Sequence, residues 1–170
     1  MTTEPTFHIV LYQPEIPTNT GNIGRLCVAA GCHLHLIGPM GFSIDEKQVK
    51  RAGLDYWVHL QHSYYENFDD FLVRHRTAMD KMSFLTTKTE QILFDMTFKQ
   101  GDWLMFGPET RGLPEDIWRP RAAQSFKIPM IGPTRSLNLA NSVSIVAFEG
   151  VRQLRVANQG PFAPLNLARE

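Results

Sequence analysis

The chain has 170 residues, of which 43% are hydrophobic and 20% charged, the proportions of a soluble globular protein. Its 17 basic and 17 acidic residues cancel, which argues against a protein that coats nucleic acid non-specifically but leaves a local basic patch open. No apolar run approaches the roughly 18 residues that cross a bilayer, and the first residues lack the basic start and apolar core of a secretion signal.

The cysteine content favours a reducing compartment. Only two cysteines occur, Cys27 and Cys32. Cys27 falls in a predicted helix and Cys32 lies just past it, so we expect two reduced, buried thiols rather than a disulfide. We therefore expect a cytoplasmic protein with no membrane partner.

Strands and helices are expected to alternate along the chain. Apolar runs predict strands over residues 7–12, 34–37, 56–60, 83–86, 103–106 and 126–128. Helical spacing predicts helices over residues 23–30, 45–51, 67–75 and 139–154. The last helix carries an apolar stripe formed by Leu139, Val143, Val146, Ala147, Val151 and Leu154. The alternation predicts an α/β fold with a mostly parallel sheet and helices on both faces, in a single domain over residues 7–156. Residues 1–6 and 157–170 are expected to be loose tails.

Three polar, glycine-rich segments follow strand-like runs and are predicted to be loops. They cover residues 19–25, 106–114 and 128–141. In α/β proteins, ligands bind in loops outside the carboxyl ends of the strands. Glycines in such loops let the backbone approach a ligand closely, and the polar side chains fix its orientation. Three such segments from distant parts of one small chain predict a single composite site.

Several common sites are excluded by missing motifs. The chain has no Gly-x-Gly-x-x-Gly after its first strand, no phosphate-binding Gly-x-x-x-x-Gly-Lys-Ser/Thr loop and no Gly-x-Ser-x-Gly elbow. Six histidines are scattered: His33 and His35 share a strand face, and His59 and His62 are three apart. Because no cysteine or acidic set accompanies them, we predict no metal site.

The sequence resembles the SPOUT superfamily of RNA methyltransferases, and within it the branch of bacterial tRNA wobble-position ribose 2′-O-methyltransferases. Four segments carry the resemblance in order, namely residues 14–25, 51–56, 106–114 and 135–141. The similarity extends from about Phe7 to Leu154. It implies an α/β fold with a C-terminal trefoil knot, and a homodimer in which the first loop of one subunit completes the site of the other.

The same resemblance implies the reaction and the site residues. The donor would be S-adenosylmethionine, S-adenosylhomocysteine the product, and the target the ribose of nucleotide 34, cytidine or uridine, in the anticodon arm of tRNA, with tRNA-Leu as the expected substrate. The implied catalytic residues are Asn19, Arg25, Glu109, Ser136 and Asn138. The implied cofactor contacts are Leu85, Gly107, Ile128, Met130, Ser136 and Leu137. The candidate RNA contacts are Arg25, Lys47, Arg51 and Arg111.

The residues leave some roles open. An arginine has a pKa above about 12, so we expect Arg25 to hold a phosphate or stabilise a forming alkoxide rather than accept a proton. Glu109 and Arg111 are close enough to form an ion pair that shapes their loop. Asn138 or Ser136 are candidates for the N-cap of the last helix, a role compatible with cofactor contact. The alternative functions are methylation of another tRNA or rRNA ribose, a non-catalytic S-adenosylmethionine- or RNA-binding module, and a flavodoxin-like nucleotide-binding regulator.

Overall fold

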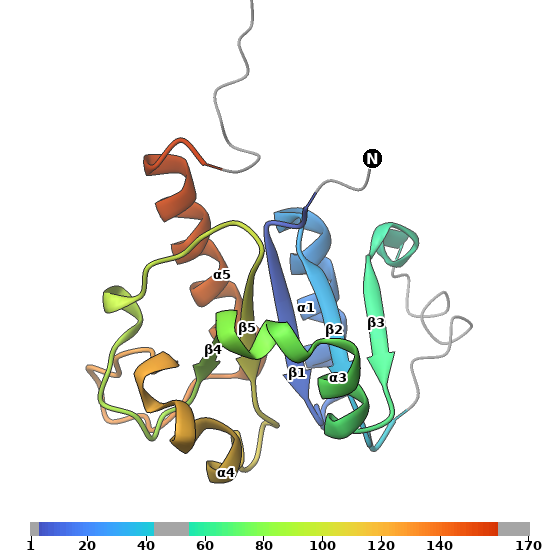
Figure 1. Ribbon diagram of the computed structural model, residues 1–170, viewed down its shortest axis with the longest axis horizontal. Helices are drawn as coiled ribbons and strands as arrows, with labels where there is room; N and C mark the ends of the chain where they lie inside the picture. The colour runs from blue at the N-terminus through green and yellow to red at the C-terminus, as the bar shows by residue number, and fades with distance from the viewer. Residues whose placement is uncertain (1–3, 43–54, 160–170) are drawn as a thin grey trace, which may run out of the picture.

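The computed structural model describes residues 4–42 and 55–159, and within this part of the chain six parallel strands form one sheet (Figure 1). The strands are β1 (Phe7–Tyr12), β2 (His33–Ile37), β3 (His62–Tyr65), β4 (Met82–Leu85), β5 (Asp102–Phe106) and β6 (Ser125–Phe126). Their order across the sheet is β3-β2-β1-β5-β4-β6. The α-helices are α1 (Pro17–Ala30), α3 (Phe68–Arg74), α4 (Glu115–Trp118) and α5 (Leu139–Val156). Short 3-10 helices cover η1 (Asp55–His59), η2 (Arg76–Lys81), η3 (Leu93–Asp95) and η4 (Arg119–Gln124).

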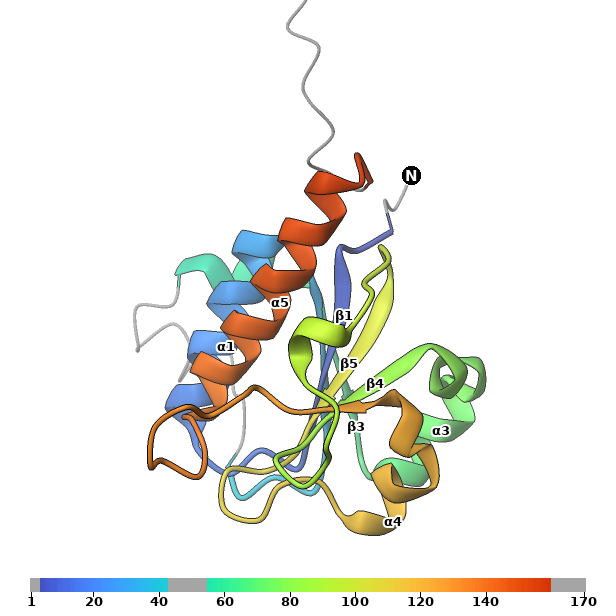
Figure 2. The ribbon, with the colours of Figure 1, turned by 90° about the vertical axis from the view of Figure 1, so that its left-hand side faces the viewer.

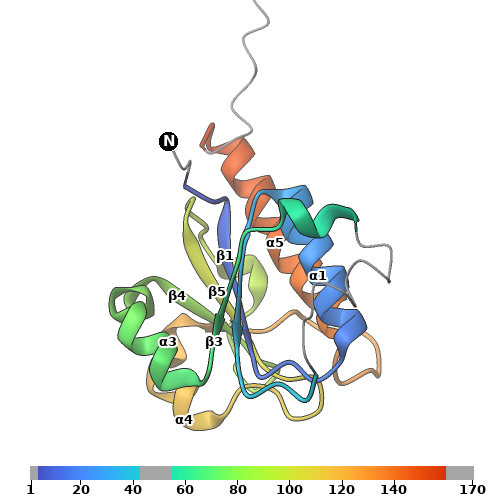
Figure 3. The same ribbon diagram turned by 90° about the vertical axis from the view of Figure 1, so that its right-hand side faces the viewer.

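Helices cover both faces of the sheet, as predicted. Figures 2 and 3 show α1 and α5 side by side on one face and α3 and α4 on the other. Alternate residues of a strand point to opposite faces, so Ile9 packs under α1 and α5 while Val10 packs with Phe71 of α3. Burial on both faces explains why the strands are apolar runs rather than alternating patterns. The trefoil knot and the limits of the domain remain predictions.

Helix α1 begins earlier than the sequence analysis predicted, and residues 19–25 are helical rather than a loop. Pro17 starts the helix, where its fixed φ suits the first turn and no N–H is needed. Gly31 ends it in the left-handed conformation, with φ of 65°. The polar composition of this segment misled the prediction because a helix tolerates polar residues on the face that meets a pocket.

The predicted strand over residues 56–60 is also wrong. Residues 56–59 belong to η1, Leu60 directly follows it, and the strand begins only at His62 and ends at Tyr65. Trp57 and Leu60, three residues apart, both pack against Gly24 of α1, where a Cβ would lie 3.1 Å from each side chain. A three-residue spacing places two side chains on one face of a 3-10 turn, which explains the structure that these apolar residues adopt.

The termini of the described chain agree with the prediction only in part. Thr6, assigned to a loose tail, is instead 2% exposed, and its backbone bonds to Gly31 and Gly101. Helix α5 ends at Val156, close to the predicted end of the last helix. The predicted helix over residues 45–51 lies outside the described residues. None of the helices described is both long enough and apolar enough to cross a lipid bilayer.

The two cysteines are free and buried, which confirms the prediction of two reduced thiols. Burial raises the pKa of Cys32 to about 12 and the pKa of Cys27 well above its ordinary value. A buried thiolate would lose its hydration without gaining a partner, so both side chains stay protonated at neutral pH.

Histidines gather at the amino ends of β1 and β2, on the face that α3 covers. Burial lowers the pKa of His8 to about 4 and that of His35 to about 2, and neighbouring imidazoles add to the effect. Burial also lowers the pKa of His33 and of His75. All four rings are therefore neutral at pH 7.

Candidate functional site

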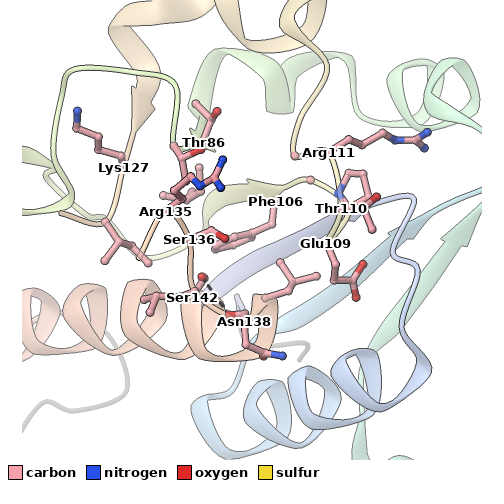
Figure 4. Close-up of a pocket in the computed structure, with 18 of the residues that line it drawn as sticks. Thr86, Phe106, Glu109, Thr110, Arg111, Lys127, Arg135, Ser136, Asn138 and Ser142 are labelled. Carbon is pink, nitrogen blue, oxygen red and sulfur yellow. Dashed lines mark hydrogen bonds between the residues drawn. The ribbon is translucent and has the colours of Figure 1, made fainter. Parts of the chain in front are cut away.

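A cavity of about 340 Å³ opens at the carboxyl ends of β4, β5 and β6, where the predicted loops meet (Figure 4). Parallel strands bring their carboxyl ends to the same edge of a sheet, so segments distant in sequence converge there. Residues from all three predicted segments line the cavity. The predicted composite site is therefore formed within a single chain.

Every predicted cofactor residue lines this cavity. These residues are Leu85, Gly107, Ile128, Met130, Ser136 and Leu137. Two aromatic residues that the sequence analysis did not name, Phe106 and Phe126, complete the apolar wall. Leu85, Phe106 and Phe126 end three neighbouring strands, so they form one side of a slot that suits a flat apolar group. The sequence could have indicated Phe106 and Phe126 as cavity residues, because both belong to predicted strands that lead into the predicted loops.

Gly107 is required by close packing of its own loop. A Cβ at this position would lie 2.2 Å from the backbone nitrogen of Leu113 and 2.3 Å from the carbonyl carbon of Gly112. Both neighbours are backbone atoms, so they cannot move aside as a flexible side chain would. The absence of a side chain therefore lets the 106–114 segment fold back on itself beside the cavity.

A chain of hydrogen bonds joins the three segments. The Glu109 carboxylate accepts from the Asn19 side-chain amide at 3.1 Å. The Asn138 amide in turn donates to the Asn19 side-chain oxygen at 2.9 Å. The Asn138 oxygen accepts from the backbone N–H of Ala140 at 2.9 Å, which makes Asn138 the N-cap of α5. Three of the predicted catalytic residues thus form one connected network.

Glu109 also binds the amino end of α1. Its carboxylate accepts from the backbone N–H groups of Glu15 at 2.8 Å and Ile16 at 3.1 Å. Ile16 is the N-cap residue and has no side-chain oxygen to offer, so an acid 93 residues away supplies the acceptor. A negative charge at this end of a helix is also favoured by the helix dipole.

The same two segments are joined a second time in the opposite direction. The Glu15 carboxylate accepts from the backbone N–H of Thr110 at 3.0 Å and from its hydroxyl at 2.8 Å. The Arg111 guanidinium donates to the Gln13 side chain at 2.8 Å. Arg111 is thus directed to Gln13, and Glu109 to the start of α1, instead of forming the ion pair that the spacing allowed.

Arg25 is not among the described residues that line the cavity of its own chain. Arg25 is exposed on α1, and its guanidinium carbon lies 4.9 Å from the centre of the Tyr56 ring. The Tyr56 hydroxyl is itself hydrogen-bonded to the carbonyl of Gly21. Lys47 and Arg51 lie outside the described residues. Ser136 lines the cavity, as predicted, and Asn138 rather than Ser136 caps the helix.

The cavity is also lined by three basic side chains that the sequence analysis did not single out, namely Lys88, Lys127 and Arg135. They lie beside the predicted Arg111, and Figure 4 labels Lys127, Arg135 and Arg111. Among the described residues that line the cavity, Glu109 alone is acidic. Two of the cations have acidic partners beside the cavity, since Lys88 lies 3.9 Å from Glu115 and Lys127 lies 3.4 Å from Glu90. Each of the three follows a strand or precedes α5, but isolated cations carry no signal of their own in a sequence.

Comparisons with known proteins agree with this geometry. The SpoU rRNA Methylase family model matches residues 6–148. A tRNA (cytidine(34)-2′-O)-methyltransferase of Escherichia coli strain K12 is 47% identical over 148 residues, which cover 86% of this chain and 93% of that protein. A solved structure described as giving insights into 2′-OH methylation of C/U34 on tRNA has a TM-score of 0.78 at 43% identity, covering 91% and 99% of the two chains.

A second solved structure was determined with its cofactor. It is an AdoMet-bound rRNA methyltransferase from Sinorhizobium meliloti, with a TM-score of 0.77 at 26% identity, covering 89% of this chain and 58% of that one. The family match spans most of the sequence and includes all three segments that line the cavity. The chain therefore belongs to the SpoU rRNA methylase family.

Proposed function

We propose that this protein is an S-adenosylmethionine-dependent methyltransferase that modifies the ribose 2′-hydroxyl of nucleotide 34, cytidine or uridine, in tRNA. The observation that carries the proposal is the convergence of Gly107, Ile128 and Ser136 on one cavity, in a chain 47% identical to a tRNA (cytidine(34)-2′-O)-methyltransferase. A role as a non-catalytic binding module has no such support, since the polar residues expected for chemistry are all present.

The residues around the cavity fit the methyl donor. When bound, S-adenosylmethionine supplies a methyl group on a positively charged sulfur, ready for displacement by an oxygen. Leu85, Phe106 and Ile128 offer an apolar slot for a flat purine ring, and Ser136 and Asn138 offer polar atoms at the amino end of α5. Such a pocket raises the rate mainly by aligning the reacting atoms and excluding water from them.

We assign the network of Glu109, Asn19 and Asn138 a positioning role. The Glu109 carboxylate already accepts three hydrogen bonds, at 2.8, 3.1 and 3.1 Å, which occupy its oxygens with structural donors. Both oxygens of Glu109 are thereby directed to groups of the protein rather than to a substrate hydroxyl. Its part in the reaction is to hold the first two segments and the start of α5 at the edges of one site.

Arg25 is proposed to act on the partner subunit's site in a homodimer. Asn19 and Arg25 are six residues apart, which turns their side chains by about 240° around α1. Asn19 is 5% exposed and directed to its own cavity, so Arg25 faces away from that cavity. Because its guanidinium stays charged, Arg25 would bind a phosphate of the RNA or stabilise the forming alkoxide, with the proton passing to phosphate or water.

Exposed apolar side chains support the dimer. Ile16 is 42% exposed at the start of α1, while Ile145 and Phe148, three residues apart on α5, are 41% and 51% exposed. Figure 2 shows α1 and α5 side by side, so a partner subunit lying across both helices would cover the exposed apolar side chains of α5 and of the start of α1. Residues 131–138 are exposed as well, so a second subunit or the RNA would close the cavity over this segment.

The anticodon arm of tRNA would meet the basic rim of the cavity. Arg111, Lys127 and Arg135 would bind phosphates there, and Lys47 and Arg51 stay candidates as RNA contacts. We also propose that the protein works in the cytoplasm, in agreement with its two free thiols.

The experiment that tests the reaction maps the methyl group directly. Purified protein is incubated with S-adenosylmethionine and unmodified tRNA-Leu transcripts carrying either cytidine or uridine at position 34, and the products are digested and analysed by mass spectrometry. One 2′-O-methyl group at nucleotide 34 is expected. A methyl group on another nucleotide would support the alternative ribose target, and cofactor binding without methylation of any RNA would support the binding module.

A complementation experiment tests the placement of Arg25. Arg25→Ala and Asn138→Ala subunits are refolded together in equal amounts, so that about half of the dimers contain one of each. If Arg25 acts across the interface, each mixed dimer has one intact site and the mixture regains roughly a quarter of wild-type activity. If Arg25 acts in its own chain, no site is intact and the mixture stays as inactive as either variant alone.

A further inference from the structure

We propose that His8, His33 and His35 form a binding site for one divalent transition metal ion, of which Zn²⁺ is the representative. One ring nitrogen from each of these histidines lies within 4.8 Å of the others. The site lies at the amino ends of β1 and β2, at the end of the strands opposite to the cavity. It does not rest on the proposed function.

The sheet itself brings the three rings together. Strands β1 and β2 are parallel, with His8 paired to His33 across the ladder. His33 and His35 are two residues apart on one strand, so their side chains point to the same face. Imidazole is the protein ligand that Zn²⁺ and its neighbours in the first transition series bind most readily after thiolate, and three imidazoles form a recurrent zinc ligand set.

The spacing of the nitrogens is close to what a metal ion needs. With metal–nitrogen bonds of about 2.1 Å, the nitrogens of a tetrahedral site lie about 3.4 Å apart. His8 Nδ1 and His35 Nε2 are already 2.9 Å apart. His33 and His35 stack, with 4.3 Å between their ring centres and 13° between their planes, so coordination of one ion requires these rings to rotate about their side-chain bonds, without a change in the strands.

Neighbouring side chains hold two of the rings from their far side. His35 Nδ1 is 2.8 Å from the Tyr65 hydroxyl, and that hydroxyl is 2.6 Å from His75 Nε2. His33 Nε2 is 2.9 Å from the Ser63 hydroxyl. These contacts leave His35 Nε2 and His33 Nδ1 for a metal ion. A polar partner on the second ring nitrogen is the usual companion of a metal-binding histidine, because it fixes the orientation of the ring.

The surroundings of the rings also suit a cation. A metal ion would replace the hydrogen bond between His8 and His35, and the proton of that bond would move to the other nitrogen of its ring. Trp103 stacks on the His8 ring at 3.9 Å with an angle of 4° between the planes, which limits the ring to small rotations. His35 is 2% exposed, but His8 and His33 are only partly buried, which leaves an open side for the ion and for one water ligand.

The site is separate from the cavity where methyl transfer is proposed. Tyr12, at the far end of β1, is four residue steps of extended strand from His8, which corresponds to about 13 Å. An ion at the histidines therefore touches no residue that lines the cavity. Its expected consequence is to join β1 to β2 and thereby to stabilise the fold.

The experiment is a metal titration of protein that carries no histidine tag and has been stripped with a chelator. We expect one equivalent of Zn²⁺ to bind per chain in competition with a chromophoric chelator, and Co²⁺ to give the intense visible bands of a tetrahedral site. His8→Ala and His33→Ala are expected to weaken Zn²⁺ binding at least 30-fold or so, and Tyr65→Phe about 10-fold. His59→Ala is the matched control, since His59 is exposed and outside the cluster.

Two results would overturn the site. The first is that wild-type protein binds no Zn²⁺ even when the free Zn²⁺ concentration is about 100 μM, which would saturate a site with a micromolar dissociation constant. The second is binding that survives in His8→Ala and His33→Ala but is lost in His59→Ala. Circular dichroism and an unfolding curve for each variant show whether it is folded. If His33→Ala does not fold, the partly buried His8 and the conservative Tyr65→Phe change still decide the question.

Discussion

Removing the Glu109 carboxylate is expected to loosen both the start of α1 and the polar network of the cavity. Glu109→Ala deletes the acceptor of three hydrogen bonds, from Glu15, Ile16 and Asn19. Water can replace the acceptor at the exposed Ile16 N–H, but the Asn19 side chain is only 5% exposed and is left without its partner. One unsatisfied buried group and the weakened helix end together predict a loss of about 2–4 kcal/mol in the free energy of unfolding.

Urea denaturation followed by circular dichroism measures this loss as a lower midpoint at an unchanged slope. Glu109→Gln keeps one carbonyl oxygen, so we expect a loss of about 1–2 kcal/mol and methyl transfer within about tenfold of wild type. Glu66→Gln, an exposed acid at the end of β3, serves as the control. The reasoning is refuted if Glu109→Ala unfolds at the wild-type urea concentration. It is equally refuted if Glu109→Gln abolishes turnover while stability and cofactor affinity stay normal, because Glu109 would then act chemically.

Three further measurements test separate parts of the structure. Gly107→Ala should lower the free energy of unfolding by about 1–3 kcal/mol and weaken S-adenosylmethionine binding, measured by calorimetry, at least tenfold or so, because the new Cβ meets backbone atoms. Gly132→Ala is the control and should change neither quantity, since the space around Gly132 is open. Cys32 should react slowly with a thiol reagent at pH 8 in the folded protein and rapidly in denaturant. Because its folded pKa is raised to about 12, its contribution to stability is complete below its ordinary pKa of 9.0 and is lost as the pH rises above that value. The difference in stability between wild type and Cys32→Ala should therefore change above pH 9 and stay constant below it. Lys88→Ala and Arg135→Ala should each weaken tRNA binding and reduce the slope of log affinity against log salt by about 1. Lys81→Ala is the control, since Lys81 directly precedes β4, at the end of that strand opposite to the cavity. Slopes equal to that of wild type would exclude phosphate contact.

The sequence indicates the parts of this fold that depend on apolar patterns. Strand β1 and helix α5 are where their apolar residues predict, because burial on both sheet faces and on one helix stripe constrains residue types strongly. The positions of the cofactor residues around one cavity were also predictable, since parallel strands place their following loops together. Apolar patterns within one strand or helix are local, so they can be recognised without knowing which distant residues pack against them.

The features that the sequence did not indicate depend on partners far along the chain. Glu109 reaches the start of α1 from 93 residues away, and no local pattern marks Ile16 as a helix end lacking its own cap. The apolar residues Trp57 and Leu60 predict a strand, and only their packing against Gly24 of α1 explains the 3-10 turn that they adopt instead. His8 joins His33 only through the register of the β1–β2 ladder. Each of these depends on which residues are neighbours in space, which a single sequence does not state.

Two residues of α1, Asn19 and Arg25, point in different directions, and we propose that one serves cofactor binding and the other methyl transfer. Asn19 completes the polar network of the cavity in its own chain, while Arg25, about 240° around the same helix, points away from it. All the predicted cofactor contacts line one cavity of a single chain, so in the proposed function one subunit binds the methyl donor. The group proposed to act on the ribose would come from the second subunit. Cofactor binding should therefore survive a change that separates the subunits, whereas methyl transfer should not, and this difference distinguishes a shared site from two independent ones.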